Sequence, residues 1–146
     1  MNVTQISTDQ NFYEQALDLR YKLFFEEFGL PKGTEKDHFE AHSIHFGLTN
    51  KESLVAYRRL SNLGSSTFKI SQVVVTPTKQ RQGHGTALLR HIINYAQGNG
   101  ARSIELNSQV AATSLYSNLG FHETGAHYPS RTTGVPHVKM VLGFAT

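Results

Sequence analysis

Residues 73–92 of the sequence, VVVTPTKQRQGHGTALLRHI, contain the transition that decides the fold. The apolar run at Val73–Val75 is typical of the end of a buried strand. From Leu88 onward, apolar residues recur at helical spacing, which predicts one face of an α-helix. Gly83 and Gly85 lie between the two patterns, so a strand is expected to pass into a helix through a glycine-containing turn.

This turn has the features of an anion-binding site. The first N–H groups of a helix have no partner within the helix and lie at the positive end of its dipole, so they bind phosphate groups readily. Glycine lacks a Cβ atom and therefore allows oxygen atoms to approach the backbone closely. Lys79, Arg81 and His84 would add positive charge at the same place. Two glycines alone, however, are more typical of a tight turn in which glycine is placed for steric reasons alone.

Two familiar phosphate-binding motifs are excluded by the residues around Gly85. A P-loop requires Gly-Lys followed by Ser or Thr, whereas Gly85 is followed by Thr86 and Ala87. A dinucleotide-binding fingerprint requires a third glycine at position 88, where this sequence has Leu88. The turn therefore needs a wider sequence context before a ligand can be assigned to it.

The rest of the chain predicts an α/β fold. Strands are expected at residues 2–6, 44–48, 53–60, 68–75, 102–107, 121–127 and 137–144, and helices at residues 12–28, 88–96 and 111–119. The segment 29–43 is polar and rich in turn residues, which indicates a loop, or a loop with one helical turn. This order of elements predicts a mixed sheet in which strand-helix-strand units flank an antiparallel centre.

Composition limits both the class of protein and its chemistry. The 146 residues, 38% of them apolar, suit one compact domain. The absence of cysteine excludes disulfides, thiolate nucleophiles and thiolate metal ligands. No membrane-spanning run and no signal peptide is recognised, which favours a cytoplasmic protein with no membrane partner. The net charge of +3 is scattered along the chain, so nucleic acid is not an expected partner.

Two stretches of the sequence resemble the GNAT superfamily of acyl-CoA-dependent N-acyltransferases. Residues 80–85, QRQGHG, match the superfamily signature Q/R-x-x-G-x-G/A, and residues 115–121, LYSNLGF, resemble its later motif, a helix with a tyrosine that closes in Leu-Gly-Phe. The predicted order of elements is also that of the superfamily. The resemblance implies one N-acetyltransferase domain over residues 1–146, with an α/β (α+β) fold of about six to seven strands in a mixed central sheet and about four helices.

Within the superfamily the chain resembles the small ElaA-like branch. The similar stretches are LRYKLFFEE at residues 19–27, the acidic pair Asp37 and Glu40 followed by His45, and GVPHVKM at residues 134–140. The first stretch departs from the usual pattern of the branch, because Glu-Glu-Phe stands where Val-Glu-Gln is commoner.

The resemblance implies acetyl-CoA as a co-substrate, no metal, and a set of residues that bind the cofactor. The backbone N–H groups of Gln82 through Thr86 would hold the pyrophosphate, with Gln80 and Arg81 beside it. The pantetheine arm would pair with the backbone of Val73–Val75, and the N–H group of Val74 or Val75 would stabilise the oxyanion. The implied cofactor-binding residues are Val73, Val74, Val75, Gln80, Arg81, Gln82, Gly83, His84, Gly85 and Thr86.

Tyr116 is the residue that the resemblance implies as proton donor to the departing thiolate. A phenol with an ordinary pKa of about 10 stays protonated at neutral pH and can donate its proton to a thiolate. Core packing is the alternative role, because Ala112, Leu115 and Leu119 share the expected helix face with Tyr116. The ring is expected to be largely buried in either role.

A general base is harder to assign. An alkylamine with a pKa of about 10 is mostly protonated at neutral pH, so a carboxylate or histidine should help to remove a proton. The candidates are Glu40, His45, His137 and, as a residue that positions a water molecule, Asn107. Residues of these types are more often surface or structural residues than bases. His137 is preferred because it belongs to the branch resemblance.

His38, His42 and His45 also raise the question of a metal site. Histidines four residues apart on a helix can bind zinc. The segment has no periodic apolar face and no H-E-x-x-H motif, however, so a polar loop that lines the acceptor site is expected instead.

The function that the resemblance implies is transfer of the acetyl group of acetyl-CoA to a primary amine, by direct attack in a ternary complex. The amine would belong to a small molecule or a protein, and a homodimer would be in keeping with the superfamily. An alternative is a catalytically inactive acyl-CoA sensor or interaction module, which the intact Tyr116 and glycine turn disfavour. The acceptor would be selected by the first helix, residues 29–43 and the YPSRTTG segment, whose shapes the sequence does not reveal.

Overall fold

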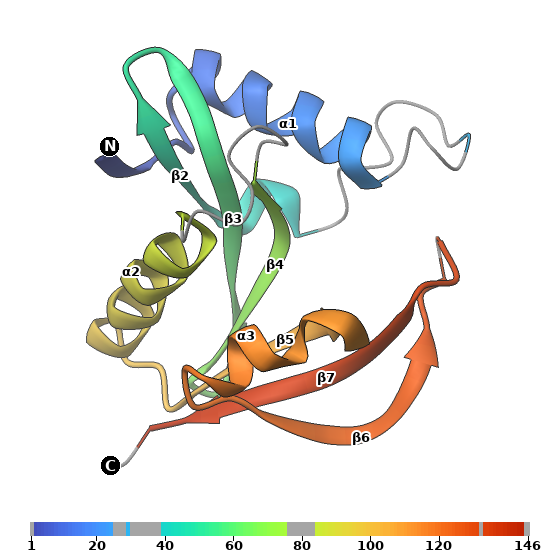
Figure 1. Cartoon of the computed structure of the whole chain (residues 1–146). Helices are drawn as coiled ribbons and strands as arrows, with labels where there is room; N and C mark the ends of the chain where they lie inside the picture. Colours follow the sequence, from blue (N-terminus) through green and yellow to red (C-terminus); the bar gives the residue numbers. More distant parts are fainter. Residues whose placement is uncertain (1, 25–28, 30–38, 76–83, 132, 145–146) are drawn as a thin grey trace.

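The computed structural model describes residues 2–24, 29, 39–75, 84–131 and 133–144. In this part of the chain, seven strands form one mixed sheet in the order β1-β2-β3-β4-β5-β7-β6 (Figure 1). The strands are β1 (Asn2–Gln5), β2 (Ile44–Asn50), β3 (Ser53–Gly64), β4 (Thr67–Val75), β5 (Ser103–Gln109), β6 (His122–Pro129) and β7 (Pro136–Gly143). Neighbouring strands are antiparallel except β4 and β5, which are parallel. One parallel pair thus joins two antiparallel halves.

Three α-helices and two 3₁₀ turns accompany the sheet in the described part of the chain. They are α1 (Gln10–Phe24), η2 (Glu40–His42), α2 (His84–Gly98), η4 (Val110–Ala112) and α3 (Thr113–Ser117). The predicted α/β class and the predicted order of elements are confirmed. The helix expected at residues 111–119 is shorter than predicted, because the chain forms a 3₁₀ turn first and Ala112 has a non-helical ψ of 5°.

α1 begins at Gln10, two residues before the predicted start, and a side-chain cap stabilises its first turn. The Oδ1 atom of Asp9 accepts a hydrogen bond from the backbone N–H of Phe12 at 3.1 Å. This bond satisfies one of the N–H groups that the first turn of a helix leaves without a partner. The predicted end of this helix, before Gly29, lies outside the described residues.

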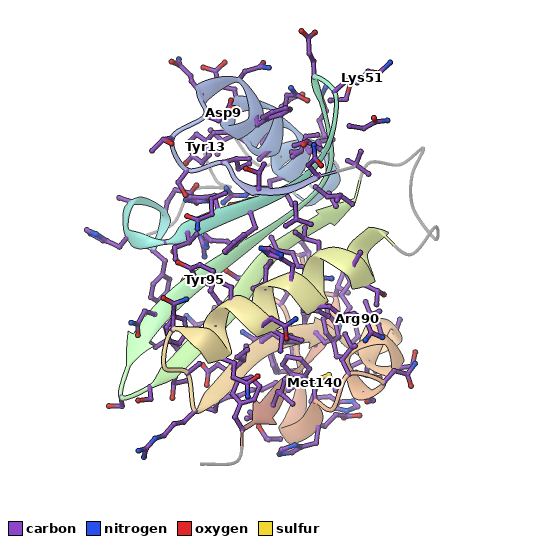
Figure 2. All side chains as sticks on the ribbon, turned by 90° about the vertical axis from the view of Figure 1, so that its left-hand side faces the viewer. Asp9, Tyr13, Lys51, Arg90, Tyr95 and Met140 are labelled. Carbon is purple, nitrogen blue, oxygen red and sulfur yellow. The ribbon has the colours of Figure 1, made fainter. Side chains whose placement is uncertain are left out.

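The two faces of the sheet support two cores. A small core of Ile6, Ala16, Leu54 and Tyr57 packs beneath α1. The larger core combines side chains of α2 and α3 with the other face of the sheet, and includes Leu88, Leu89, Ile92, Ile104, Leu106, Tyr116, Val138 and Met140. Figure 2 looks from the side of α2, which lies across the strands, with Met140 below it and Tyr13 of α1 at the opposite end. α1 therefore covers one face of the sheet, and α2 and α3 cover the other face.

The parallel pairing of β4 with β5 ends early. Only Thr67–Ser103, Phe68–Ile104 and Lys69–Glu105 are paired. Beyond them β4 continues alongside β3 and β5 continues alongside β7, and Figure 1 shows the two strands separating. Within the described residues, the backbone of 70–75 thus has no strand partner on the side of β5. Its N–H and C=O groups on that edge can pair with another extended molecule.

A β-bulge lies on the same part of β4. Tyr57 pairs with Val74 and Arg59 pairs with Ser71, so two residues of β4 lie opposite the single residue Arg58 of β3. An extra residue in one strand bends that strand and redirects its backbone groups. The bulge therefore changes the direction of the free N–H groups in the segment where the oxyanion-stabilising group is predicted.

Gly120 provides a test of the turn that ends the α3 region. Its φ of +98° is unfavourable for any residue with a side chain, and a Cβ atom there would lie 3.1 Å from Cδ1 of Leu142. We expect Gly120→Ala to lower the free energy of unfolding by about 1–3 kcal/mol, measured by urea denaturation.

Gly98 is the matched control, because it lies in the last turn of α2 and an added Cβ atom would contact nothing within 4 Å. Gly98→Ala should leave stability unchanged or raise it by up to about 1 kcal/mol. Equal losses in the two variants would contradict the assignment of strain to Gly120.

Candidate functional site

The predicted cofactor-binding residues divide into three groups in the structure. Val73–Val75 form the end of β4, and His84, Gly85 and Thr86 form the first turn of α2. Gln80, Arg81, Gln82 and Gly83 lie outside the described residues. The structure thus confirms the strand before the turn and the helix after it. Because the first N–H groups of α2 have no partner within the helix, they are the groups available to an anion.

Tyr116 lies close to the start of α2 and is buried, with 7% of its surface exposed. Its ring packs against Phe121 in an edge-to-face arrangement, with the ring centroids 6.0 Å apart. Its hydroxyl oxygen accepts a hydrogen bond from Nη1 of Arg58 at 3.4 Å, and Nη2 of Arg58 donates to the backbone carbonyl of Gly85, also at 3.4 Å. One guanidinium therefore links the predicted proton donor to the first turn of α2.

Arg58 is a residue of this site that the sequence reasoning missed. It lies in β3 and is 1% exposed, although arginine is rarely fully buried. The available signal was its position in the otherwise apolar run LVAYRRL at residues 54–60. Arginine in a strand more often faces solvent, and the sequence does not show which of the two adjacent arginines points to which face.

A second polar cluster lies on the other face of the sheet, around the carboxylate of Glu40. Arg20 donates to both of its oxygens, Nη2 to Oε1 at 2.8 Å and Nη1 to Oε2 at 3.0 Å. Arg59 donates to Oε1 at 3.1 Å, and the hydroxyl of Tyr13 donates to Oε2. Glu40 is therefore held by two buried cations and a phenol, which come from α1 and β3.

His45 completes this cluster in a defined tautomer. Its Nε2 atom lies 3.1 Å from the backbone carbonyl oxygen of Glu40, which can only accept, so Nε2 carries the hydrogen. Nδ1 must then accept from the hydroxyl of Tyr57, which itself accepts from Nη1 of Arg20 at 3.3 Å. Both ring nitrogens of His45 are therefore occupied within the protein.

The environment of Glu40 and His45 argues against either as a general base. Burial alone would raise the pKa of Glu40, but hydrogen bonds from Arg20 and Tyr13 outweigh it and lower the pKa to about 2. Burial lowers the pKa of His45. A carboxylate that holds protons so weakly, and an imidazole whose lone pair is already in use, are poorly suited to take a proton from an amine.

Asn107 and His137 lie on one face of the C-terminal half of the sheet. Asn107 pairs with Lys139 and Gln109 pairs with His137, and side chains of paired residues point to the same face. The alternate residues of these strands belong to the core under α2 and α3, so Asn107 and His137 face the opposite side. Asn107 is exposed and His137 is half-buried.

Nδ1 of His137 lies 2.7 Å from the backbone carbonyl oxygen of Val135 and must donate to it. The neutral imidazole then keeps its lone pair on Nε2. Of the four candidate bases, His137 thus has a ring nitrogen that can accept a proton.

A family profile described as an acetyltransferase (GNAT) domain matches residues 5–144. The chain belongs to the GNAT acetyltransferase family. This protein is therefore an N-acetyltransferase, as the resemblance implied.

Three known proteins place this acetyltransferase among its relatives. Its sequence is 32% identical over 83 residues to the ribosomal protein bS18-alanine N-acetyltransferase of Escherichia coli, covering 55% of each chain. Its fold is similar to that of Escherichia coli ElaA, with a TM-score of 0.82, 19% identity and 97% of each chain covered. It is also similar to an aminoglycoside 6'-N-acetyltransferase complexed with coenzyme A, with a TM-score of 0.79 and 14% identity over 100% of this chain and 98% of the other. The two structural likenesses concern the fold alone.

Metal ligands and membrane-spanning helices can be assessed in the described part of this acetyltransferase. No group of three or more His, Asp or Glu side chains there is arranged to hold a metal ion, and His38 lies outside that part. None of the helices described is long and apolar enough to cross a membrane.

Glu40 is predicted to be essential for the stability of this acetyltransferase. Glu40→Gln removes the charge that compensates Arg20 and Arg59, so we expect the free energy of unfolding to fall by about 3–5 kcal/mol, measured by urea denaturation.

Glu105→Gln is the matched control for Glu40→Gln. Glu105 pairs with Lys139 at 3.2 Å, but both side chains are partly exposed, so its loss should cost less than about 1 kcal/mol. A comparable loss in the free energy of unfolding of the two variants would show that the Glu40 cluster stabilises the fold no more than an exposed ion pair does.

The same cluster predicts how stability depends on pH. As the pH falls below 6.5, the unfolded chain takes up a proton on His45 that the folded protein resists, so stability should decline. A further decline should follow between pH 4.5 and about 2, as Glu40 is protonated in the unfolded and then the folded state. Above pH 10, stability should fall again, because burial and the hydrogen bond to Glu40 raise the pKa of Tyr13 to about 12.

Urea denaturation over a pH series measures this profile. The His45→Gln variant should lack the first decline and keep the second. A wild-type protein with constant stability between about pH 7 and pH 5 would contradict the role assigned to His45.

Proposed function

We propose that this acetyltransferase moves the acetyl group of acetyl-CoA to a primary amine, by direct attack in a ternary complex, and that residues 1–146 form one domain for this purpose. The observation that carries the proposal is the position of the Tyr116 hydroxyl, buried and joined through Arg58 to the first turn of α2. The side chain of Arg58 thus contacts both the proposed proton donor and the start of the helix at the predicted phosphate site.

Acetyl-CoA would bind along the line where β4 and β5 separate. The free backbone edge of Val73–Val75 would pair with the pantetheine arm, and the N–H groups of His84, Gly85 and Thr86 would face the pyrophosphate. Gln80, Arg81, Gln82 and Gly83 would complete the phosphate site. The bulge in β4 supports the N–H group of Val74 or Val75 as the donor to the oxyanion.

Tyr116 would act as the general acid when the thioester breaks. Its ring belongs to the apolar core and its hydroxyl is buried beside Arg58, where water would not compete for its proton. The short helix α3 holds it there, and the turn at Gly120 closes this helix with a hydrogen bond from Phe121 N–H to the carbonyl of Tyr116 at 3.1 Å.

His137 would act as the general base, with Asn107 positioning a water molecule. Both residues lie on the face of the sheet opposite Tyr116. The base would therefore act on the amine from one face, and the acid would act on the thiolate from the other. Nε2 of His137 carries the free lone pair that a base needs. This arrangement suits an amine that attacks the thioester directly, because acid and base act at different atoms.

The acceptor class is a primary amine of a small molecule or of a protein. Relatives whose names specify an acceptor include both kinds, an aminoglycoside and an alanine of ribosomal protein bS18. A homodimer and a cytoplasmic location stay predictions from the sequence. The alternative function, an inactive acyl-CoA-binding module, predicts binding without turnover.

The experiment that tests the function measures acetyl-CoA-dependent release of free thiol over a panel of primary amines. The panel should contain aminoglycosides, polyamines and peptides with a free N-terminal alanine. Turnover with at least one amine is expected. Coenzyme A binding without turnover on any of them would favour the inactive module, and absence of binding would overturn both.

The Tyr116→Phe variant tests the role of the acid. We expect kcat to fall by about 10²-fold or more, while the Kd for acetyl-CoA changes little, because the ring keeps its packing and loses only the hydroxyl. Tyr95→Phe is the control, since Tyr95 lies on α2 with its ring against Phe46 and should have unchanged kinetics. An unchanged kcat in Tyr116→Phe would contradict the assignment of Tyr116 as the general acid.

A further inference from the structure

Arg58 is a buried cation with fewer partners than it can hold. Its two hydrogen bonds, to the Tyr116 hydroxyl and the Gly85 carbonyl, are both 3.4 Å long, at the weak end of N–H···O geometry. Its Nε atom is buried and has no hydrogen-bond partner in the part of the chain that the structure describes. A guanidinium has five N–H donors and no acceptor, so the described residues use only part of its capacity.

The neighbouring arginine shows what a fully compensated side chain looks like in this protein. Arg59, on the other face of β3, pairs with Glu40 at 3.1 Å and donates from Nε to Ser71 at 3.0 Å. No ion pair among the described residues includes Arg58. Burial of a charge without an ion pair is costly, so the described residues do not explain Arg58 by the stability of the fold.

We propose that Arg58 positions Tyr116 for proton donation and then stabilises the phenolate that donation leaves. This inference rests on the proposed acetyl transfer with Tyr116 as acid. Because Arg58 can only donate, the oxygen of Tyr116 must accept from it, and the hydroxyl hydrogen must point elsewhere. In the proposed ternary complex that hydrogen would be donated to the sulfur of coenzyme A.

The packing of Arg58 supports this positioning role. Its Cζ atom lies 5.6 Å from the centroid of the Tyr116 ring, so the guanidinium contacts the ring as well as the hydroxyl. The bond to the Gly85 carbonyl ties the same guanidinium to the helix start that faces the cofactor. Arg58 therefore fixes Tyr116 relative to the predicted phosphate site.

The proton transfer balances as follows. When the tetrahedral intermediate collapses, the C–S bond breaks and the sulfur keeps the electron pair. The O–H bond of Tyr116 breaks as the S–H bond forms, and the negative charge moves to the phenol oxygen beside Arg58. The amine nitrogen loses one proton to solvent through the base, and the phenolate takes one proton back from solvent.

The test is a double-mutant cycle with Arg58→Met and Tyr116→Phe, measured with the amine that the wild type acetylates. Methionine keeps the length of the side chain and removes its charge and its hydrogen bonds. We expect Arg58→Met to lower kcat about 10- to 100-fold, with the Kd for coenzyme A changed by less than about threefold. In the Tyr116→Phe background, Arg58→Met should have no further effect, because the hydroxyl on which it acts is absent.

Thermal unfolding separates this role from a structural one. Since Arg58 is poorly compensated, Arg58→Met should unfold at the same or a higher temperature than the wild type in the absence of ligand. A structural arginine would instead give a lower unfolding temperature and lose coenzyme A affinity together with activity. If Arg58→Met does not fold, Arg58→Lys is used, and it should keep stability but lose most of kcat, because one ammonium nitrogen does not reproduce the separate positions of Nη1 and Nη2.

The outcomes distinguish this inference from the proposed function. A wild type without turnover, or a Tyr116→Phe variant with full activity, would overturn the proposed function. An active wild type, an impaired Tyr116→Phe and a fully active Arg58→Met would overturn the role of Arg58 alone. An equal loss from Arg58→Met with and without the Tyr116 hydroxyl would also overturn it.

Discussion

The parallel pairing of β4 with β5 lasts for only three residue pairs, and the arrangement of the site depends on where it stops. β3 supports β4 from one side and β7 supports β5 from the other, so the two strands can separate without either becoming isolated. The segment 70–75 then has a free backbone edge, next to the bulge opposite Arg58. α2 begins after β4, and α3 follows β5, so the separation also sets the distance between the first turn of α2 and Tyr116. A single arginine side chain spans that distance.

Alternation along β3 gives its two adjacent arginines different tasks. Arg59 points to the α1 face, where Glu40, Arg20 and Tyr13 form a cluster whose charges balance. Arg58 points to the face covered by α2 and α3, where it contacts a phenol and a carbonyl but no carboxylate of the described residues. Buried charges contribute to stability only when opposite charges compensate them, as in the Glu40 cluster. A buried arginine without a carboxylate partner suits a site in which negative charge develops only during a reaction.

Sequence periodicity predicted the strands and helices well, because the burial of side chains alternates along strands such as β5 and repeats along helices such as α2. It could not predict that β7 would lie between β5 and β6, since strand order depends on pairing across the sheet. Tyr116 and the first turn of α2 were found through local motifs. The Glu40 cluster was not found, because its members come from α1, η2, β2 and β3. Arg58 was missed because the sequence does not show which of two adjacent arginines in an apolar run points to which face, or that its Nε atom has no partner among the described residues.

The two faces of the sheet also divide the chemistry of the proposed reaction. Tyr116 and Arg58 lie on the side of α2 and α3, while Asn107 and His137 lie on the side that these helices leave uncovered. Protons would therefore be removed from the amine on one side of the sheet and delivered to the sulfur on the other. Acid and base on opposite faces could each act on its own atom of the reacting group. The early end of the parallel pair would leave a thioester between β4 and β5 open to groups from both faces of the sheet.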